Sequence, residues 1–85
     1  MSELLPVRVT VEAWEEVKLD LSTATTVGDV KRQALAAVRV VEDPAEFLVK
    51  FRGAELRDES RTLADVAFPG GGALIVLRRR RRAVR

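Results

Sequence analysis

Few side chains in this sequence could carry catalytic or metal-binding chemistry. Neither His nor Cys occurs among its 85 residues, so the commonest general base, the thiolate nucleophile and the usual zinc ligands are missing. A Ser-His-Asp triad is therefore impossible. No base is visible near the serines, which are Ser2, Ser22 and Ser60. The carboxylates of so small a chain indicate a solvated acidic surface, and we expect no enzyme, no cofactor and no metal site.

Three consecutive glycines, Gly70, Gly71 and Gly72, form a glycine-rich stretch. A phosphate-binding loop needs a Lys-Ser/Thr pair and a following helix. Here the pair is absent, and the residues that follow are strand-like. The stretch therefore predicts a tight turn and no phosphate site.

Charge is distributed unevenly along the chain. Residues 1–77 contain nine Lys or Arg and 13 Asp or Glu, a net charge of −4, whereas residues 78–85 contain six Arg and no acid. The run from Arg78 to Arg82 directly follows an apolar segment, Ala73 to Leu77. The sequence thus predicts an acidic body with a basic tail.

Four interpretations of the tail stay open. It is a solvated end that aids solubility, or it docks on an acidic protein surface, another copy of the chain included. A head-to-tail contact of that kind either closes to a ring or grows into a filament. Binding to nucleic acid or an anionic membrane is favoured less, because the tail lacks interleaved aromatic residues and the body is acidic. The fourth interpretation is a conjugable protein modifier or its relic.

Composition places the chain among small globular proteins. It is 47% hydrophobic and 33% charged, and 85 residues predict one domain with a small core. No apolar run approaches the roughly 20 residues of a membrane span, and the N-terminus resembles no signal peptide. The absence of Cys suits a reducing compartment, so we expect a cytoplasmic location. Frequent Arg and Ala favour a bacterial source with a GC-rich genome.

Two alternating segments predict a first hairpin. Val7, Val9, Val11 and Ala13 share one face of the first segment, the period-two pattern of a half-buried strand. The segment at residues 17–21 repeats the pattern, with Val17, Leu19 and Leu21 facing inward. The link around residues 14–16 lacks a favoured Asn-Gly turn and predicts a longer or bulged loop.

A helix is predicted next, over about three turns. Thr26 followed by Asp29 resembles a capping box, and apolar residues recur at helical spacing from Val27 to Val38. Lys31 falls outside this apolar stripe. Gly28 weakens the helix slightly.

The second half of the chain predicts short strands and turns. Phe47, Val49 and Phe51 share one face of a strand, and a turn at Gly53 leads into a very short strand. Residues 60–66 predict one helical turn capped by Thr62 or Ser60. The run at residues 73–77 predicts a last strand that is buried on both faces and central in the sheet. The first and last strands then lie side by side and parallel, and the fold class is an α+β roll.

The order of these elements resembles the β-grasp fold of ubiquitin. The segment "TTVGDVKRQAL" is similar to the start of ubiquitin's helix, with Thr before a β-branched residue and then Val-Lys. The segment "FRGAELRDESRTLADV" resembles ubiquitin's Phe-x-Gly-x-x-Leu-x-Asp-x-x-Arg-Thr-Leu-x-Asp. The matching residues are Phe51, Gly53, Leu56, Asp58, Arg61, Thr62, Leu63 and Asp65. The resemblance implies a mixed sheet of four to five strands packed on one amphipathic helix. In this fold Phe51, Leu56 and Leu63 are expected in the core.

The sequence departs from the ubiquitin pattern at two places that bear on function. Modifiers of this family end in Gly-Gly, but no Gly follows Gly72 here, and Gly70 to Gly72 precede the last strand. In ubiquitin an apolar residue of the third strand anchors most partners, whereas the outward position here is Lys50. The resemblance implies a ubiquitin-like protein of a ubiquitination-like operon or a secretion system. Activating and conjugating enzymes are its possible partners.

The sequence thus divides into an N-terminal extension (residues 1–6), a ubiquitin-like domain (7–78) and a basic tail (79–85). We expect a non-enzymatic protein that works by protein–protein interaction, with a partner of acidic surface. The predicted partner-binding residues are Arg78, Arg79, Arg80, Arg81, Arg82, Arg85, Lys50, Trp14 and Phe68, and Val84 is a further exposed apolar candidate. The lysines that could take part in a conjugate are Lys18, Lys31 and Lys50.

Overall fold

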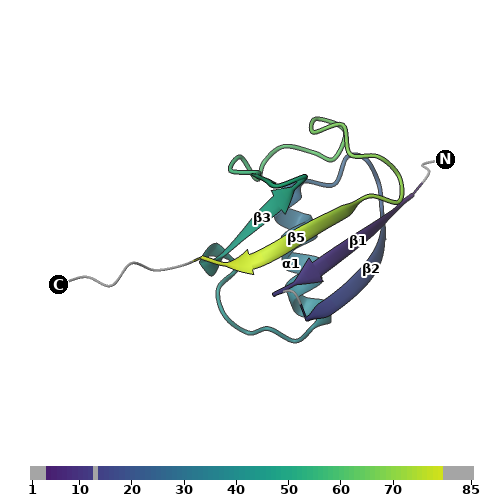
Figure 1. Ribbon diagram of the computed structural model, residues 1–85. Coiled ribbons are helices and arrows are strands. Elements are labelled where there is room, and N and C mark those ends of the chain that lie inside the picture. The colour runs from purple at the N-terminus through teal and green to yellow at the C-terminus, as the bar shows by residue number, and fades with distance from the viewer. Residues whose placement is uncertain (1–3, 13, 80–85) are drawn as a thin grey trace.

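A computed structural model describes residues 4–12 and 14–79 of the chain. In this part of the chain a mixed sheet of five strands packs on one α-helix (Figure 1). The elements are β1 (Leu5–Val11), β2 (Glu15–Leu21), α1 (Val27–Ala37), the 3₁₀ helix η1 (Pro44–Glu46), β3 (Phe47–Phe51), β4 (Ala54–Glu55) and β5 (Ala73–Arg78). The predicted α+β class and order of elements are confirmed. No helix within the described residues is long and apolar enough to cross a membrane.

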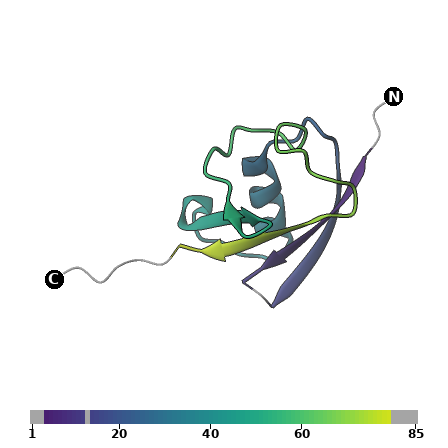
Figure 2. The same cartoon turned by 45° about the horizontal axis from the view of Figure 1, so that its top comes forward.

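Strand β5 lies in the middle of the sheet, whose order is β2-β1-β5-β3-β4. It runs parallel to β1 and antiparallel to β3, as Figure 1 shows. Helix α1 covers one face of the sheet (Figure 2). The predicted parallel pairing of the first and last strands is therefore confirmed.

The β1–β2 hairpin supplies one side of the core. Val7, Val9 and Val11 are buried, and the register places Val9 opposite Val17. Strand β1 has the expected length but begins and ends two residues earlier, at Leu5 and Val11, and β2 is two residues longer because it begins at Glu15. Leu5 therefore belongs to the sheet, although it was assigned to an N-terminal extension.

Helix α1 starts at the predicted cap. The Thr26 side chain accepts a hydrogen bond from the Asp29 amide at 3.1 Å, which satisfies one of the free donors of the first turn. The Asp29 carboxylate instead pairs with Arg32. Gly28 permits a close approach of the loop after β4, because an added Cβ would lie 3.2 Å from the Glu59 carbonyl oxygen.

Lys31 is buried, although its position was predicted to lie outside the apolar stripe. Only 3% of the surface of Lys31 is exposed. Its Nζ donates hydrogen bonds to the Phe47 carbonyl oxygen at 3.0 Å and to Glu59 Oε2 at 2.8 Å. A buried ammonium is tolerated when an opposite charge and an additional acceptor replace its water. Helix periodicity alone did not reveal this, because those acceptors come from distant segments.

Strand β5 is buried on one face only, which corrects the expectation of a strand covered on both sides. Leu74 and Val76 point toward the helix and are fully buried, whereas Ile75 between them is 40% exposed. The reason is that α1 covers a single face of the sheet. A continuous apolar run therefore places part of its side chains in solvent.

The burial of two aromatic residues in the second half of the chain, Phe51 and Phe68, differs from expectation. Phe51 and Leu56 are partly buried at the edge of the core, while Leu63 is fully buried. Phe68 was predicted to be exposed, but it is 7% exposed and its ring centroid lies 5.2 Å from that of Phe51. Gly72 makes this packing possible, because an added Cβ would come within 2.9 Å of the Phe68 ring.

The predicted helical turn at residues 60–66 is a hydrogen-bonded turn and not a helix. Thr62 and Asp65 close it reciprocally. The Asp65 amide donates to Thr62 Oγ1 at 3.0 Å, and the Thr62 amide donates to Asp65 Oδ2 at 3.0 Å. Thr62 thus caps the turn as expected.

Burial predicts that Phe47 contributes more to stability than Phe51. We expect Phe47→Ala to lower the free energy of unfolding by about 3–5 kcal/mol, because the ring is fully buried. Phe51→Ala should cost about 2 kcal/mol less, since its ring is already partly hydrated. Urea unfolding followed by circular dichroism measures both changes. Equal losses would contradict the burial difference described above.

The Lys31–Glu59 pair predicts an asymmetry between its two partners. The Lys31 side chain is 4% exposed and that of Glu59 is 26% exposed, so only the carboxylate can regain water when its partner is removed. We therefore expect Glu59→Leu to destabilise the protein by about 3–5 kcal/mol, and Lys31→Met to cost clearly less. Thermal unfolding of both variants tests the order, and a larger loss for Lys31→Met would refute it.

Candidate functional site

Arg78, the first arginine of the basic run, is held against the body of the protein. Its Nε lies 3.6 Å from Glu12 Oε2, and its Nη2 lies 3.3 Å from Glu42 Oε2. The guanidinium also lies over the Phe47 ring, with its Cζ 4.9 Å from the centroid, a favourable cation–π contact. The end of β5 is thereby joined to the β1–β2 turn and to the loop after α1.

Arg79 is held on the other side of the same strand end. Its amide donates to the Glu46 carbonyl oxygen at 2.7 Å, and its Nε donates to the Ala45 carbonyl oxygen at 3.1 Å. Its Nη1 lies 3.4 Å from Glu55 Oε2. The first two arginines therefore already have partners within the chain. The other tail residues predicted to bind partners lie outside the described residues, and these are Arg80, Arg81, Arg82, Val84 and Arg85.

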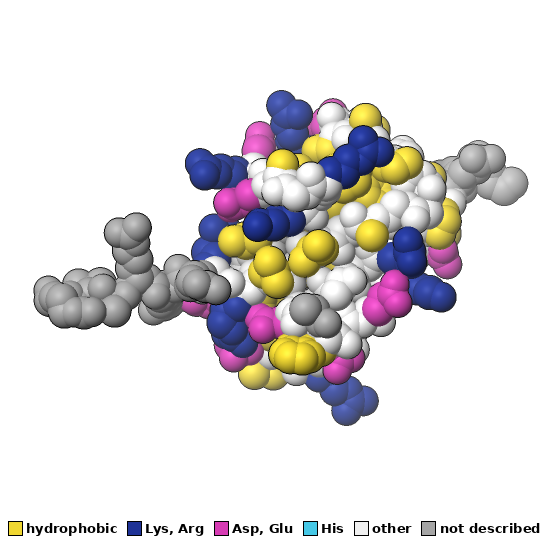
Figure 3. Space-filling model, in the orientation of Figure 1, with side chains coloured by type: hydrophobic (Ala, Val, Ile, Leu, Met, Phe, Trp, Pro, Cys, Tyr) yellow, Lys and Arg dark blue, Asp and Glu magenta, His cyan; other side chains and the backbone are white. Residues whose placement is uncertain are grey.

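Acidic residues gather where the tail leaves the body. Glu12 and Glu42 contact Arg78. Two further acidic residues, Glu15 and Asp43, lie close to them in sequence and are exposed. We call Glu12, Glu15, Glu42 and Asp43 the acidic collar. Figure 3 shows acidic and basic side chains mixed at this end of the molecule, beside the start of the tail. Four of the 13 acidic residues of the chain thus lie in or beside the loops that meet at the start of the tail.

Two large apolar side chains are exposed next to the acidic collar. Trp14 is 85% exposed and Val41 is 94% exposed. Trp14 lies two residues after Glu12, and Val41 directly precedes Glu42. Because Arg78 contacts both glutamates, the two loops meet at the root of the tail. The expected exposure of Trp14 is confirmed, whereas sequence reasoning missed Val41.

The open face of the sheet carries a second apolar surface. Side chains that alternate with the core residues point away from α1, and yellow side chains are visible on this face in Figure 3. The register places Leu48 opposite Leu77 and Lys50 opposite Ile75. We call Leu48, Lys50, Ile75 and Leu77 the open-face patch. Sequence reasoning missed its three apolar members. The alternation of β3 and β5 reveals them once one face of each strand is taken as exposed.

Lys50 brings a positive charge to the open-face patch. It lies between Val49 and Phe51 on β3 and points outward as predicted, partly buried among its neighbours. It forms no ion pair within the described part of the chain. Its cross-strand neighbour Glu55 contacts Arg57 and Arg79 instead. The ammonium group is therefore available to an acidic group of a partner.

The lysines predicted for conjugation differ in accessibility. Lys18 is exposed on β2 and Lys50 is partly exposed on β3. Lys31 is buried in its pair with Glu59, so its amine does not face solvent in the folded protein. Lys31 was predicted as a possible conjugation lysine, and its burial contradicts that prediction.

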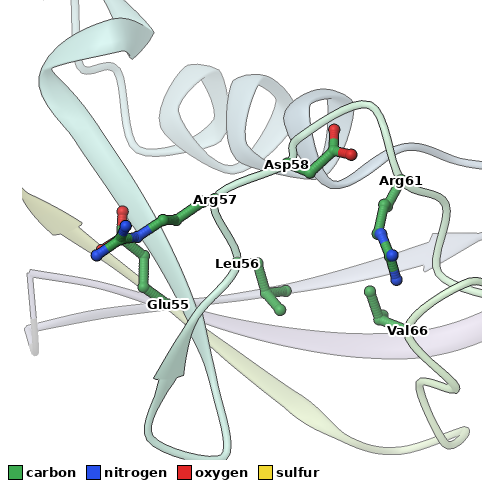
Figure 4. Close-up of a pocket in the computed structure, with 6 residues that line it drawn as sticks. All are labelled: Glu55, Leu56, Arg57, Asp58, Arg61 and Val66. Atoms are coloured by element: carbon green, nitrogen blue, oxygen red, sulfur yellow. The ribbon is translucent and has the colours of Figure 1, made fainter.

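A shallow pocket of about 200 Å³ lies beside the loop after β4. Leu56 and Val66 face each other across it, and Arg61 extends along its side (Figure 4). Asp58 belongs to its lining, and hydrogen bonds from the Ser60 side chain and amide, followed by the charge of Arg61, lower the pKa of its carboxyl group. The Ser60 hydroxyl donates a hydrogen bond to this carboxylate, so a carboxylate does lie beside one of the serines, contrary to expectation. Both residues are exposed and belong to one turn, in which the carboxylate satisfies the amide and the hydroxyl of Ser60. Within residues 4–12 and 14–79, no cluster of acidic side chains has the arrangement of a metal site.

Sequence comparison alone does not relate this chain to known proteins. No protein-family model matches the sequence, and no curated protein sequence matches it either. Solved structures, in contrast, match over almost the whole chain. A ubiquitin from Caldiarchaeum subterraneum has a TM-score of 0.78 and 16% sequence identity, covering 94% of this chain and 99% of that chain.

Two further structures agree with this match. The ubiquitin-like domain of the Arabidopsis thaliana protein At2g32350 has a TM-score of 0.77 and 18% identity, and the match covers 98% of this chain and 86% of that chain. A protein described as a molecular mimic of SUMO that promotes DNA repair has a TM-score of 0.77 and 16% identity, with 89% and 92% of the two chains covered. Together with the strand order described above, these matches establish that the chain has the ubiquitin-like β-grasp fold.

Proposed function

We propose that this chain is a non-enzymatic ubiquitin-like protein that acts by binding other proteins through its open-face patch. The observation that carries this proposal is an exposed apolar surface at the centre of the sheet, with Ile75 40% exposed. Beside it lies the ammonium group of Lys50, which forms no ion pair with the described residues. Soluble domains bury most of their large apolar side chains. A group of three apolar side chains on an open strand pair is therefore a plausible contact surface.

The chemistry of the patch defines the partner that fits it. Leu48, Ile75 and Leu77 lie on two paired strands, so one apolar side chain of a partner can contact all of them. Each 100 Å² of apolar surface removed from water contributes about 2.5 kcal/mol. A carboxylate placed next to that side chain would pair with Lys50. The fitting partner thus presents an apolar anchor with an adjacent acidic residue.

Two other functions remain proposals beside this one. The basic tail would support self-association, for which the net charges of body and tail provide the attraction. A modifier role, with activating and conjugating enzymes as partners, is supported by the likeness to the Caldiarchaeum subterraneum ubiquitin and by the accessible Lys18 and Lys50. Blocking the C-terminal carboxylate separates these roles, because a modifier needs that group for conjugation and a binding protein does not.

The open-face patch predicts a selective loss of partners on substitution. We expect Ile75→Glu to reduce partner enrichment from extracts of the source organism about tenfold or more, because a charge replaces the central apolar contact. Lys50→Glu should weaken binding of the same partners, and Lys50→Arg should retain most of it. The measurement is quantitative affinity enrichment with the immobilised full chain.

Ala64→Glu is the matched control, because Ala64 is exposed in the turn after Thr62 and lies outside the patch. Thermal unfolding of each variant verifies that the fold is retained. The proposal fails if Ile75→Glu and Ala64→Glu retain the same partners as the parent protein.

A further inference from the structure

The end of the molecule at which the tail begins combines three features. Trp14 and Val41 are more exposed than any other large apolar residue that the structure describes. The acidic collar lies between and beside them, and Arg78 joins the two loops through Glu12 and Glu42. We call this surface, which consists of Trp14, Val41, Arg78 and the acidic collar, the tail tip. The tail tip is a contact surface separate from the open-face patch, because that patch lies on the open face of the sheet.

The tail tip still has unpaired negative charge. Glu15 forms no ion pair with the described residues. Asp43 is exposed, and its carboxylate accepts a hydrogen bond from the Ala45 amide but forms no ion pair with the described residues. Glu42 contacts Arg78 through one oxygen, and its side chain is 48% exposed. Carboxylates therefore remain available next to the two exposed apolar side chains.

We propose that the tail tip binds the tail tip of a second copy of this chain around a two-fold axis. Trp14 and Val41 of one copy pack against those of the other, and Arg80 to Arg82 of each copy pair with Glu15, Glu42 and Asp43 of its partner. The inference rests on the self-association proposed above and specifies its geometry. It differs from the head-to-tail contact expected from the sequence.

The two-fold geometry follows from the position of the charges. A head-to-tail contact requires the acidic acceptor to lie far from the tail, on another side of the body. Here the acidic collar lies where the described part of the chain ends, at Arg78 and Arg79. Negative charge and the start of the basic run therefore share one surface, which is complementary to itself. Self-complementary surfaces form isologous contacts, which close at a dimer and do not grow.

The same charges argue against an anionic lipid surface as the main partner. A basic run beside an exposed Trp would suit an anionic membrane interface. The exposed carboxylates of Glu15, Glu42 and Asp43, however, would be repelled by anionic head groups. A second copy accepts both the arginines and the carboxylates, and it also covers the two apolar side chains.

The chain contains its own reporter for this contact, because Trp14 is its single tryptophan and it has no tyrosine. We expect light scattering to show a mass that doubles from micromolar to millimolar concentration and then stays constant. Trp14 fluorescence should shift to shorter wavelength over the same concentration range, since the ring leaves water. Both changes should diminish at high salt, because exposed charges are screened.

A charge exchange provides the decisive test. One full-length variant carries R80E, R81E and R82E, and the other carries E15R, E42R and D43R. Each alone should dimerise about tenfold or more weakly than the parent, and their equimolar mixture should restore a heterodimer. Restoration in the mixture also shows that both variants are folded. Asp20→Arg is the matched control, because Asp20 pairs with Pro6 at the opposite end of the hairpin.

Several outcomes would overturn the inference. Mass growth beyond the dimer would indicate head-to-tail assembly, and a parent that stays monomeric would exclude self-association altogether. Failure of the mixed variants to pair would exclude the proposed charge contacts.

Other outcomes would assign the contact to a different surface or partner. A dimer that Ile75→Glu abolishes and the tip variants leave intact would assign the contact to the open-face patch. A Trp14 shift on phosphatidylglycerol vesicles without any dimer would favour a lipid surface. Loss of partner binding with the dimer intact would refute only the function proposed for the patch.

Discussion

The ammonium group of Lys31 connects three segments that the sequence keeps apart. It bonds the Phe47 carbonyl oxygen, 16 residues away, and the Glu59 carboxylate, 28 residues away. Helix α1, the start of β3 and the loop after β4 are thereby fixed to one another. The Gly28 amide, which donates to the Glu59 carbonyl oxygen at 2.9 Å, reinforces the same junction. The position of the helix over the sheet depends on this junction, because a buried charge cannot be left without partners.

The helix position in turn determines which surfaces remain for binding. Since α1 covers only one face, the alternate residues of β5 and β3 are divided between core and solvent. Leu74 and Val76 fill the core, and Ile75 with Leu77 forms part of the open-face patch. The central strand then delivers the basic tail at the end where the acidic collar lies. Core, patch and tail tip are thus three consequences of one strand arrangement.

Local patterns predicted much of the fold but little of the binding surface. The alternation of Val7, Val9 and Val11 and the cap at Thr26 were sufficient to place strands and helix, because these signals depend on neighbouring residues only. The burial of Lys31 and of Phe68 could not be predicted in this way, since their contacts are distant in sequence. The contact of Arg78 with Glu12 joins residues 66 positions apart. Charge counts along the chain revealed an acidic body, but not that Glu12 and Glu42 meet at Arg78.

The parallel pairing of β1 and β5 has a mechanical consequence. The ladder runs from Arg8 opposite Ala73 to Val11 opposite Val76. The start of β1 and the end of β5 lie at opposite ends of the sheet (Figure 1). A force that pulls the ends apart therefore acts along both strands and shears their hydrogen bonds together, instead of opening them one after another. Such a load is resisted by the whole ladder at once. A tail that is held by a partner would thus transmit tension directly into the central strand of the sheet.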